Sequence, residues 1–101
     1  LSVEEYAKAI EDTTIVRLDV RTAEEYADGH IENTLNIDVL KDDFQEKALI
    51  TLPKDKTIAV NCRSGKRSKN AAKILVKNGY KVIELDEGYN GWVSKGMPVT
   101  K

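Results

Sequence analysis

The residues best suited to chemistry form one short stretch, Cys62-Arg63-Ser64-Gly65-Lys66-Arg67-Ser68, which contains the only cysteine of the 101-residue chain. Four cationic side chains lie within seven residues of this cysteine: Arg63, Lys66, Arg67 and Lys69. A thiol beside cations or a helix N-terminus loses its proton more readily than a free thiol, and the thiolate is the reactive form. The stretch therefore predicts a nucleophilic thiolate at Cys62.

The flanking elements would hold this stretch as a loop between a strand and a helix. Residues 57–61, Thr-Ile-Ala-Val-Asn, form a short β-branched run that predicts a buried strand. Apolar residues at helical spacing then predict a helix over residues 68–78 that stops at Gly79: Ala71, Ala72, Leu75 and Val76. Such a loop turns backbone N–H groups inward, and the helix start adds about half a positive charge. We expect a cradle that favours anions around the thiol.

The alternative for Cys62 is structural, because a lone cysteine is often a small buried hydrophobe. Gly65 and the basic cluster argue against that reading, since apolar burial beside four charged side chains would be costly. We therefore expect a reactive thiol rather than a small buried hydrophobe.

Length and composition indicate one globular domain spanning residues 1–101, with 41% hydrophobic and 33% charged residues. No apolar run approaches the roughly 20 residues of a membrane span, so we expect no membrane partner. A single cysteine cannot form an internal disulfide, and with His30 as the only histidine it cannot complete a Cys/His zinc site. We expect no metal.

The net charge of −1 conceals an asymmetry between the two halves of the chain. Residues 1–53 carry 5 basic and 13 acidic side chains, whereas residues 54–101 carry 11 basic and 4 acidic ones. The positive charges gather around one thiol and its helix without interleaved aromatic residues, which argues against nucleic-acid binding. Steering of a small anionic substrate to the loop accounts for them better.

Taken in order, the chain alternates helices and strands. Ser2 with Glu5, and Thr22 with Glu25, have the spacing of capping boxes and predict two short helices, the second ending at Gly29. Strands are predicted at residues 15–20, 34–37, 57–61 and 82–85. A helix capped by Asp42 is predicted before Pro53, and a last short helix around Trp92.

This alternation predicts a parallel sheet with helices on both faces. The strand-to-helix loops of such a sheet lie along its carboxyl edge, where ligands bind. Three segments belong to that edge: the Cys62 loop, Asp19 with Arg21, and residues 86–89. We expect them to converge on one pocket, with Asp19 and Arg21 either at its rim or joined in an ion pair that fixes two loops.

Three segments of the chain resemble the signatures of single-domain rhodanese-like proteins, a sulfurtransferase family. The first consists of Leu18-Asp19-Val20-Arg21, Glu25-Tyr26 and Gly29-His30-Ile31; the second is Cys62 through Ser68, of the form Cys-x-x-Gly-x-Arg-Ser. The third runs from Leu85 and Gly88 through Gly91-Trp92 to Gly96-Met97-Pro98. Departures occur at Asn33-Thr34, at Asp38 and at Glu87, the last of which replaces one glycine of a pair at the expected pocket rim.

The resemblance implies a three-layer α/β/α fold with a parallel sheet of four to five strands and a ping-pong reaction without a cofactor. Cys62 would take sulfur from a small anionic donor such as thiosulfate, hold it as a persulfide and pass it to cyanide or to a thiol, including a protein thiol. The loop residues Arg63, Ser64, Gly65, Lys66, Arg67 and Ser68 would bind the donor or shape the site.

Individual roles in and beside the loop can be predicted more closely. We expect Arg67 to brace the loop by pairing with an acid such as Glu25, and Ser68 to cap the following helix rather than donate to the sulfur. His30 is expected to be a hydrogen-bonded packing residue rather than a catalytic one.

Two other classes of function remain open from the sequence. A cysteine-based phosphatase or arsenate reductase also uses a thiolate in an anion cradle. Such phosphatases place one residue more between Cys and Arg than the four between Cys62 and Arg67, so the loop here suits a sulfur atom better than a phosphoryl group. A non-catalytic binding module or slow sulfur carrier is the other class.

The sequence leaves compartment and assembly open. Because the chain opens with Leu1 rather than Met, we expect a trimmed form. We favour the cytoplasm, with the periplasm as the alternative if a signal segment was removed, and we expect a monomer.

Overall fold

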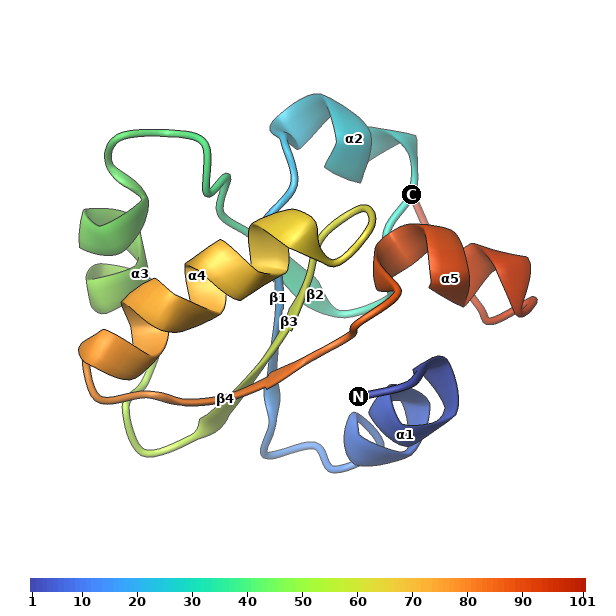
Figure 1. Ribbon diagram of the computed structural model, residues 1–101, viewed down its shortest axis with the longest axis horizontal. Coiled ribbons are helices and arrows are strands. Elements are labelled where there is room, and N and C mark those ends of the chain that lie inside the picture. Colours follow the sequence, from blue (N-terminus) through green and yellow to red (C-terminus); the bar gives the residue numbers. More distant parts are fainter.

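The centre of the molecule is a four-stranded parallel sheet, seen in a computed structural model that describes residues 1–101 (Figure 1). Its strands are β1 (Val16–Asp19), β2 (Thr34–Asn36), β3 (Thr57–Asn61) and β4 (Lys81–Glu84), in the order β2-β1-β3-β4. The register places Asp19 beside both Asn36 and Asn61, so β1, β2 and β3 end at the same level. The predicted parallel α/β architecture is confirmed, with four strands.

Five helices surround the sheet: α1 (Val3–Ala9), α2 (Ala23–Asp28), α3 (Phe44–Thr51), α4 (Lys66–Lys77) and α5 (Gly88–Ser94). α3 and α4 lie on one side of the sheet, α1 and α5 on the other, and α2 lies beyond the carboxyl end of β1 (Figure 1). The two faces therefore carry helices, as the three-layer prediction requires. None of the helices has the length and hydropathy that crossing a bilayer demands.

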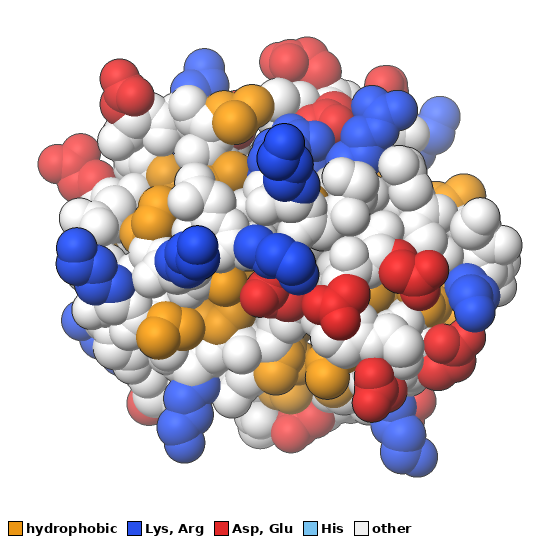
Figure 2. All heavy atoms as spheres, viewed as in Figure 1, with side chains coloured by type: hydrophobic (Ala, Val, Ile, Leu, Met, Phe, Trp, Pro, Cys, Tyr) orange, Lys and Arg blue, Asp and Glu red, His pale blue; other side chains and the backbone are white.

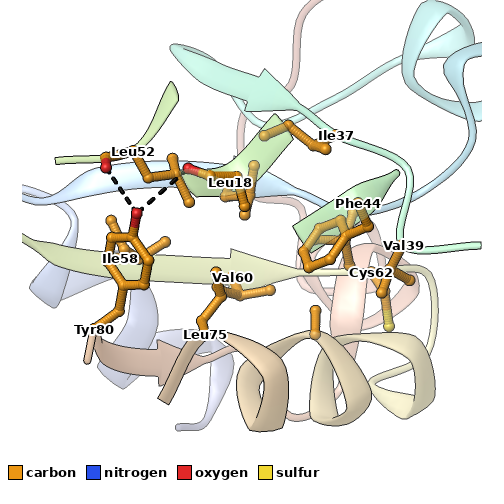
Figure 3. Packing of buried hydrophobic residues seen from close by; sticks show 13 residues of the cluster. Leu18, Ile37, Val39, Phe44, Leu52, Ile58, Val60, Cys62, Leu75 and Tyr80 are labelled. Carbon is orange, nitrogen blue, oxygen red and sulfur yellow. Dashed lines mark hydrogen bonds between the residues drawn. The ribbon is translucent and has the colours of Figure 1, made fainter. Parts of the chain in front are cut away.

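Two hydrophobic clusters hold the layers together, one on each face of the sheet. Alternation along β3 sends Ile58 and Val60 into the cluster beneath α3 and α4, and Ala59 into the cluster beneath α1 and α5. In the first cluster the Tyr80 hydroxyl donates to the carbonyls of Leu52 at 2.8 Å and Ala48 at 3.3 Å, which ties β4 to α3 (Figure 3). A buried phenol needs such partners.

The helix starts agree with the sequence in two cases and differ in two. Both capping boxes form: Ser2 and Thr22 accept the backbone N–H groups of Glu5 and Glu25, whose side chains accept in return. α3 begins after Asp43 rather than Asp42, with no side-chain cap bond.

The helix after the cysteine loop begins earlier than predicted. Residue 66 is its first residue, two positions before the predicted start, and Gly65 is the N-cap in a left-handed conformation with φ of 96°. Glycine takes this conformation without the steric cost of a Cβ atom. The prediction that Ser68 caps the helix is therefore wrong.

Candidate active site

The Cys62 loop connects the end of β3 to the start of α4 and folds back over the cysteine. The Gly65 N–H donates a hydrogen bond to Sγ of Cys62, with a nitrogen-to-sulfur distance of 3.0 Å. This is one bond of the amide cradle that the sequence predicts. It favours negative charge on the sulfur, because a hydrogen bond to the charged form of a group stabilises that form.

The junction between β4 and α5 supports the loop from one side. The N–H groups of Tyr89 and Asn90 donate to the carbonyls of Cys62 at 2.7 Å and Arg63 at 3.0 Å. The approach depends on Gly88 (φ 65°), because a Cβ atom there would lie 2.5 Å from the Arg63 carbonyl oxygen. Backbone contacts therefore fix both carbonyls of the loop entry.

Cys62 is completely buried, which differs from the expectation that the neighbouring charges oppose its burial in the core. It belongs to the core cluster that contains Val39 and Phe44, whose side chains lie near it in Figure 3. The expectation failed because the cations beside the cysteine do not enter the core with it: Arg63 and Lys66 are exposed. Long cationic side chains keep their charged ends in water, so their desolvation does not oppose burial of the sulfur.

Arg67 braces the loop against α2, and Glu25 is its partner as predicted. Its Nη1 and Nη2 donate to the two carboxylate oxygens of Glu25 at 2.8 and 3.0 Å. These bonds, helped by those from Thr22, lower the pKa of Glu25 from 4.5 to about 2 against the opposing effect of desolvation. The pKa of Arg67 is raised, chiefly by the bonds to Glu25 and further by the negative charges of Glu25, of a Cys62 thiolate and of Asp38.

Asp19 and Arg21 form a buried ion pair rather than two separate rim residues. The Nε and Nη2 atoms of Arg21 bond both carboxylate oxygens of Asp19 at 2.8–3.0 Å, and Nη2 also donates to the Gly29 carbonyl at 2.7 Å. The guanidinium carbon lies 4.1 Å from the centre of the Tyr89 ring, a cation–π contact. Arg21 thereby connects β1, the end of α2 and the start of α5.

The remaining predicted residues occupy distinct places. Ser68 is buried in the first turn of α4, where its hydroxyl donates to the Gly65 carbonyl at 3.0 Å instead of to the sulfur. Ser64 and Lys66 are exposed beside the loop. His30 stacks on Tyr26, with 3.7 Å between ring centres, and its Nδ1 lies 2.8 Å from the Tyr26 carbonyl, so it packs as predicted.

A polar pocket of about 210 Å³ lies at the carboxyl edge of the sheet. Arg21, Glu25, Asp28 and Gly29 line it on one side, and Arg63, Tyr89 and Asn90 on the other. The three predicted segments do converge, although Cys62 and Asp19 are not among the lining residues. Asp28 and Asn90 were not predicted as pocket residues. Asp28 could have been identified from its position just before Gly29, at the end of a helix on this edge.

Cations gather on the surface over α4 and the loop before it. Figure 2 shows Lys and Arg side chains along α4 and over the loop before it. No group of three or more His, Cys, Asp and Glu side chains is arranged to hold a metal ion.

The chain thus combines a parallel α/β sandwich with a cysteine loop between the third strand and the following helix, and this combination is typical of one class of small domains. The chain belongs to the rhodanese-like domain family, whose profile matches residues 2–95. In a comparison of structures, a rhodanese-related protein from Thermoplasma volcanium superposes with a TM-score of 0.88 at 31% identity, covering 99% of this chain and 95% of that one.

Several curated relatives carry functional names, and two of them show the range. A sulfurtransferase of Allochromatium vinosum is 33% identical over 98 residues, covering 95% of this chain and 89% of that protein. Protein HIGH ARSENIC CONTENT 1, mitochondrial, of Arabidopsis thaliana is 36% identical over 90 residues, covering 79% of this chain and 53% of that protein. The chain thus spans about half the length of the second relative. Family and first relative together support sulfur transfer as the general class of activity.

Proposed function

We propose that this chain is a sulfurtransferase in which the Cys62 thiolate accepts a sulfur atom from an anionic donor such as thiosulfate. The observation that carries the proposal is the Gly65 N–H bond to Sγ within a loop flanked by exposed cations. A backbone donor held in place stabilises both a thiolate and the persulfide anion that replaces it.

The first step is a displacement at sulfur. The Cys62 thiolate attacks the outer sulfur of thiosulfate, the new S–S bond forms, and the bond to the sulfonate sulfur breaks with its electron pair leaving on sulfite. The product is a Cys62 persulfide anion. The thiolate form of Cys62 is the nucleophile in this step.

The second step returns the enzyme to its starting state. Cyanide or a thiolate attacks the outer sulfur of the persulfide, and Cys62 leaves as the thiolate. Because Cys62 is sealed in this conformation, some of the atoms that cover it must move before either reactant arrives.

Steady-state assays with thiosulfate and cyanide test this function directly. Cys62→Ser keeps an acceptor for the Gly65 N–H, so we expect native circular dichroism and thermal unfolding together with complete loss of sulfur transfer. Thiosulfate:cyanide activity in Cys62→Ser equal to that of the natural chain would overturn the mechanism.

Assays on the natural chain, with Cys62→Ser as the control, separate the competing classes. A persulfide that forms with thiosulfate but is discharged only by a protein thiol would identify a carrier. Cys62-dependent arsenate reduction without persulfide formation would identify the arsenate reductase instead.

A further inference from the structure

The pocket beside the Cys62 loop is lined by charged groups of both signs. Its cationic side comes from Arg21 and Arg63 and its anionic side from Glu25 and Asp28. Which ligand it favours depends on which of these groups are already paired within the protein.

Arg21 keeps one end of its guanidinium free despite its burial. Its Nε and Nη2 donate hydrogen bonds to Asp19 and to the Gly29 carbonyl, whereas Nη1 has no partner in the protein. The buried side-chain nitrogen and oxygen atoms without a hydrogen-bond partner all belong to Tyr6 and Asn61. Because Nη1 of Arg21 also lacks a partner but is not one of these buried atoms, it is accessible at the surface of the pocket. Arg63 is also largely free: its side chain is 64% exposed, and its one ion pair, to Glu25, is 3.8 Å long.

The two carboxylates of the pocket, Glu25 and Asp28, differ in whether they are paired within the protein. Glu25 is held by both guanidinium nitrogens of Arg67. Asp28, the last residue of α2, is exposed and makes no side-chain hydrogen bond or ion pair. The pocket thus offers free donors for a carboxylate at Arg21 and Arg63, and a free acceptor for an ammonium group at Asp28.

We propose that this pocket binds the acceptor, and that the acceptor is a zwitterionic α-amino-acid thiol such as free cysteine. Its carboxylate would bind Arg21 and Arg63, and its ammonium group Asp28. A purely anionic ligand meets opposition here from the unpaired Asp28 carboxylate, which argues against this pocket as the thiosulfate site. The inference rests on the proposed function and adds the acceptor class to it.

The pocket adjoins the reacting residue through the backbone. Arg63 follows Cys62 in the chain, and the N–H of Tyr89 donates to the Cys62 carbonyl. In the transfer the acceptor thiolate attacks the outer sulfur of the Cys62 persulfide, the Sγ–S bond breaks, and its electron pair stays on Cys62. The acceptor leaves as its own persulfide, so no oxidant or reductant is consumed.

A panel of matched thiols tests the inference. Cys62 is loaded with inorganic polysulfide, the excess is removed, and loss of the added sulfur is followed by intact mass against increasing acceptor. The panel contains L-cysteine, 3-mercaptopropionate, which lacks the ammonium group, cysteamine, which lacks the carboxylate, and 2-mercaptoethanol, which lacks both. Rates are normalised to thiolate concentration, because attack at sulfur requires the thiolate.

We expect L-cysteine to discharge the persulfide roughly three- to tenfold faster than either single-charge analogue at low concentration, the range set by one exposed charge pair. In Asp28→Asn this advantage over 3-mercaptopropionate should disappear. Glu24→Gln is the matched control, since it removes an exposed carboxylate of α2 that does not line the pocket; it should keep the advantage.

Equal normalised rates across the panel would overturn the inference, as would an L-cysteine advantage that survives Asp28→Asn. Loading with polysulfide keeps this result separate from the proposed function. A protein that thiosulfate fails to load, yet that discharges preferentially to L-cysteine, would refute the donor and support the acceptor.

Discussion

At the scale of single residues, Glu25 has the most connections around the candidate site. It closes the capping box of α2, accepts two bonds from Arg67 of α4 and lies 3.8 Å from Arg63 of the loop. A bidentate guanidinium–carboxylate pair is directional as well as attractive, so it sets the position of α4 relative to α2.

Glu25→Gln should therefore loosen the loop. The variant loses the charge and one acceptor oxygen, and we expect the free energy of unfolding to fall by about 1 kcal/mol, since solvent screens a half-buried pair. Chemical denaturation measures this. Glu24→Gln, on the same helix and without such contacts, should unfold like the natural chain; equal effects of the two changes would contradict the role of Glu25.

The same pair predicts a pH dependence of stability. The pKa of Glu25 is lowered from 4.5 to about 2 in the folded chain, so its contribution is complete above about pH 4.5 and is lost as the pH falls toward 2. The difference in unfolding free energy between the natural chain and Glu25→Gln should shrink over that window. A difference that stays constant from pH 6 to pH 3 would refute the assignment.

The sequence allowed some of these residue roles to be predicted. Arg67 lies in the predicted loop and was expected to pair with an acidic residue. Glu25 was a candidate because it lies in a predicted helix at the same carboxyl edge of the sheet. The burial of Cys62 could not be predicted, since sequence spacing does not show that Arg63 and Lys66 turn outward while the sulfur turns inward.

At the scale of elements, the Cys62 loop is packed backbone to backbone against the junction of β4 and α5. A Cβ atom at Gly65 would lie 2.0 Å from the Asp86 carbonyl oxygen, far inside van der Waals contact. The loop can hold the Gly65 N–H at the sulfur only because residue 65 has no Cβ atom and its backbone can lie against the Asp86 carbonyl.

Gly65→Ala compared with Gly79→Ala separates close approach from backbone conformation. Both glycines have similar positive φ angles, 96° and 92°, but Gly79 has no atom within 4 Å of the added Cβ position. We expect Gly79→Ala to cost roughly 1–2 kcal/mol, from the left-handed conformation alone, and Gly65→Ala to cost clearly more. Thermal and denaturant unfolding measure both; equal losses would contradict the proposed packing.

Element boundaries illustrate what local sequence can and cannot specify. The alternation of helices and strands, their number and both capping boxes follow from local patterns. The start of α4 does not, because local patterns do not show that Gly65 takes a left-handed conformation close to Asp86, a residue distant in sequence.

At the scale of the whole molecule, the uneven distribution of charge along the chain gathers Lys and Arg side chains over α4 and the loop, with Asp and Glu side chains beside them (Figure 2). The field of these cations raises the local concentration of anions and weakens with added salt.

The parallel topology brings the three loops to one edge, which the sequence predicts. The lining by Asp28 and Asn90 depends on side-chain positions that no spacing rule supplies.

Lys66→Glu tests the cations beside the loop against Lys77→Glu, a change of equal charge at the opposite end of α4. Reversing the charge beside the loop should raise KM for thiosulfate roughly three- to tenfold at low salt, whereas reversing it at Lys77 should have little effect. Raising the ionic strength to about 1 M should remove the difference, because the Debye length then falls to about 3 Å. An unchanged KM for Lys66→Glu at low salt would count against steering by the loop.

The intact mass of the protein after incubation with thiosulfate shows whether Cys62 carries the transferred sulfur. We predict the addition of one sulfur atom, located on Cys62, removed by cyanide and absent in Cys62→Ser. A parallel incubation with p-nitrophenyl phosphate should leave the mass unchanged and release no nitrophenol. No added sulfur from thiosulfate, or an equal addition to Cys62→Ser, would contradict the account.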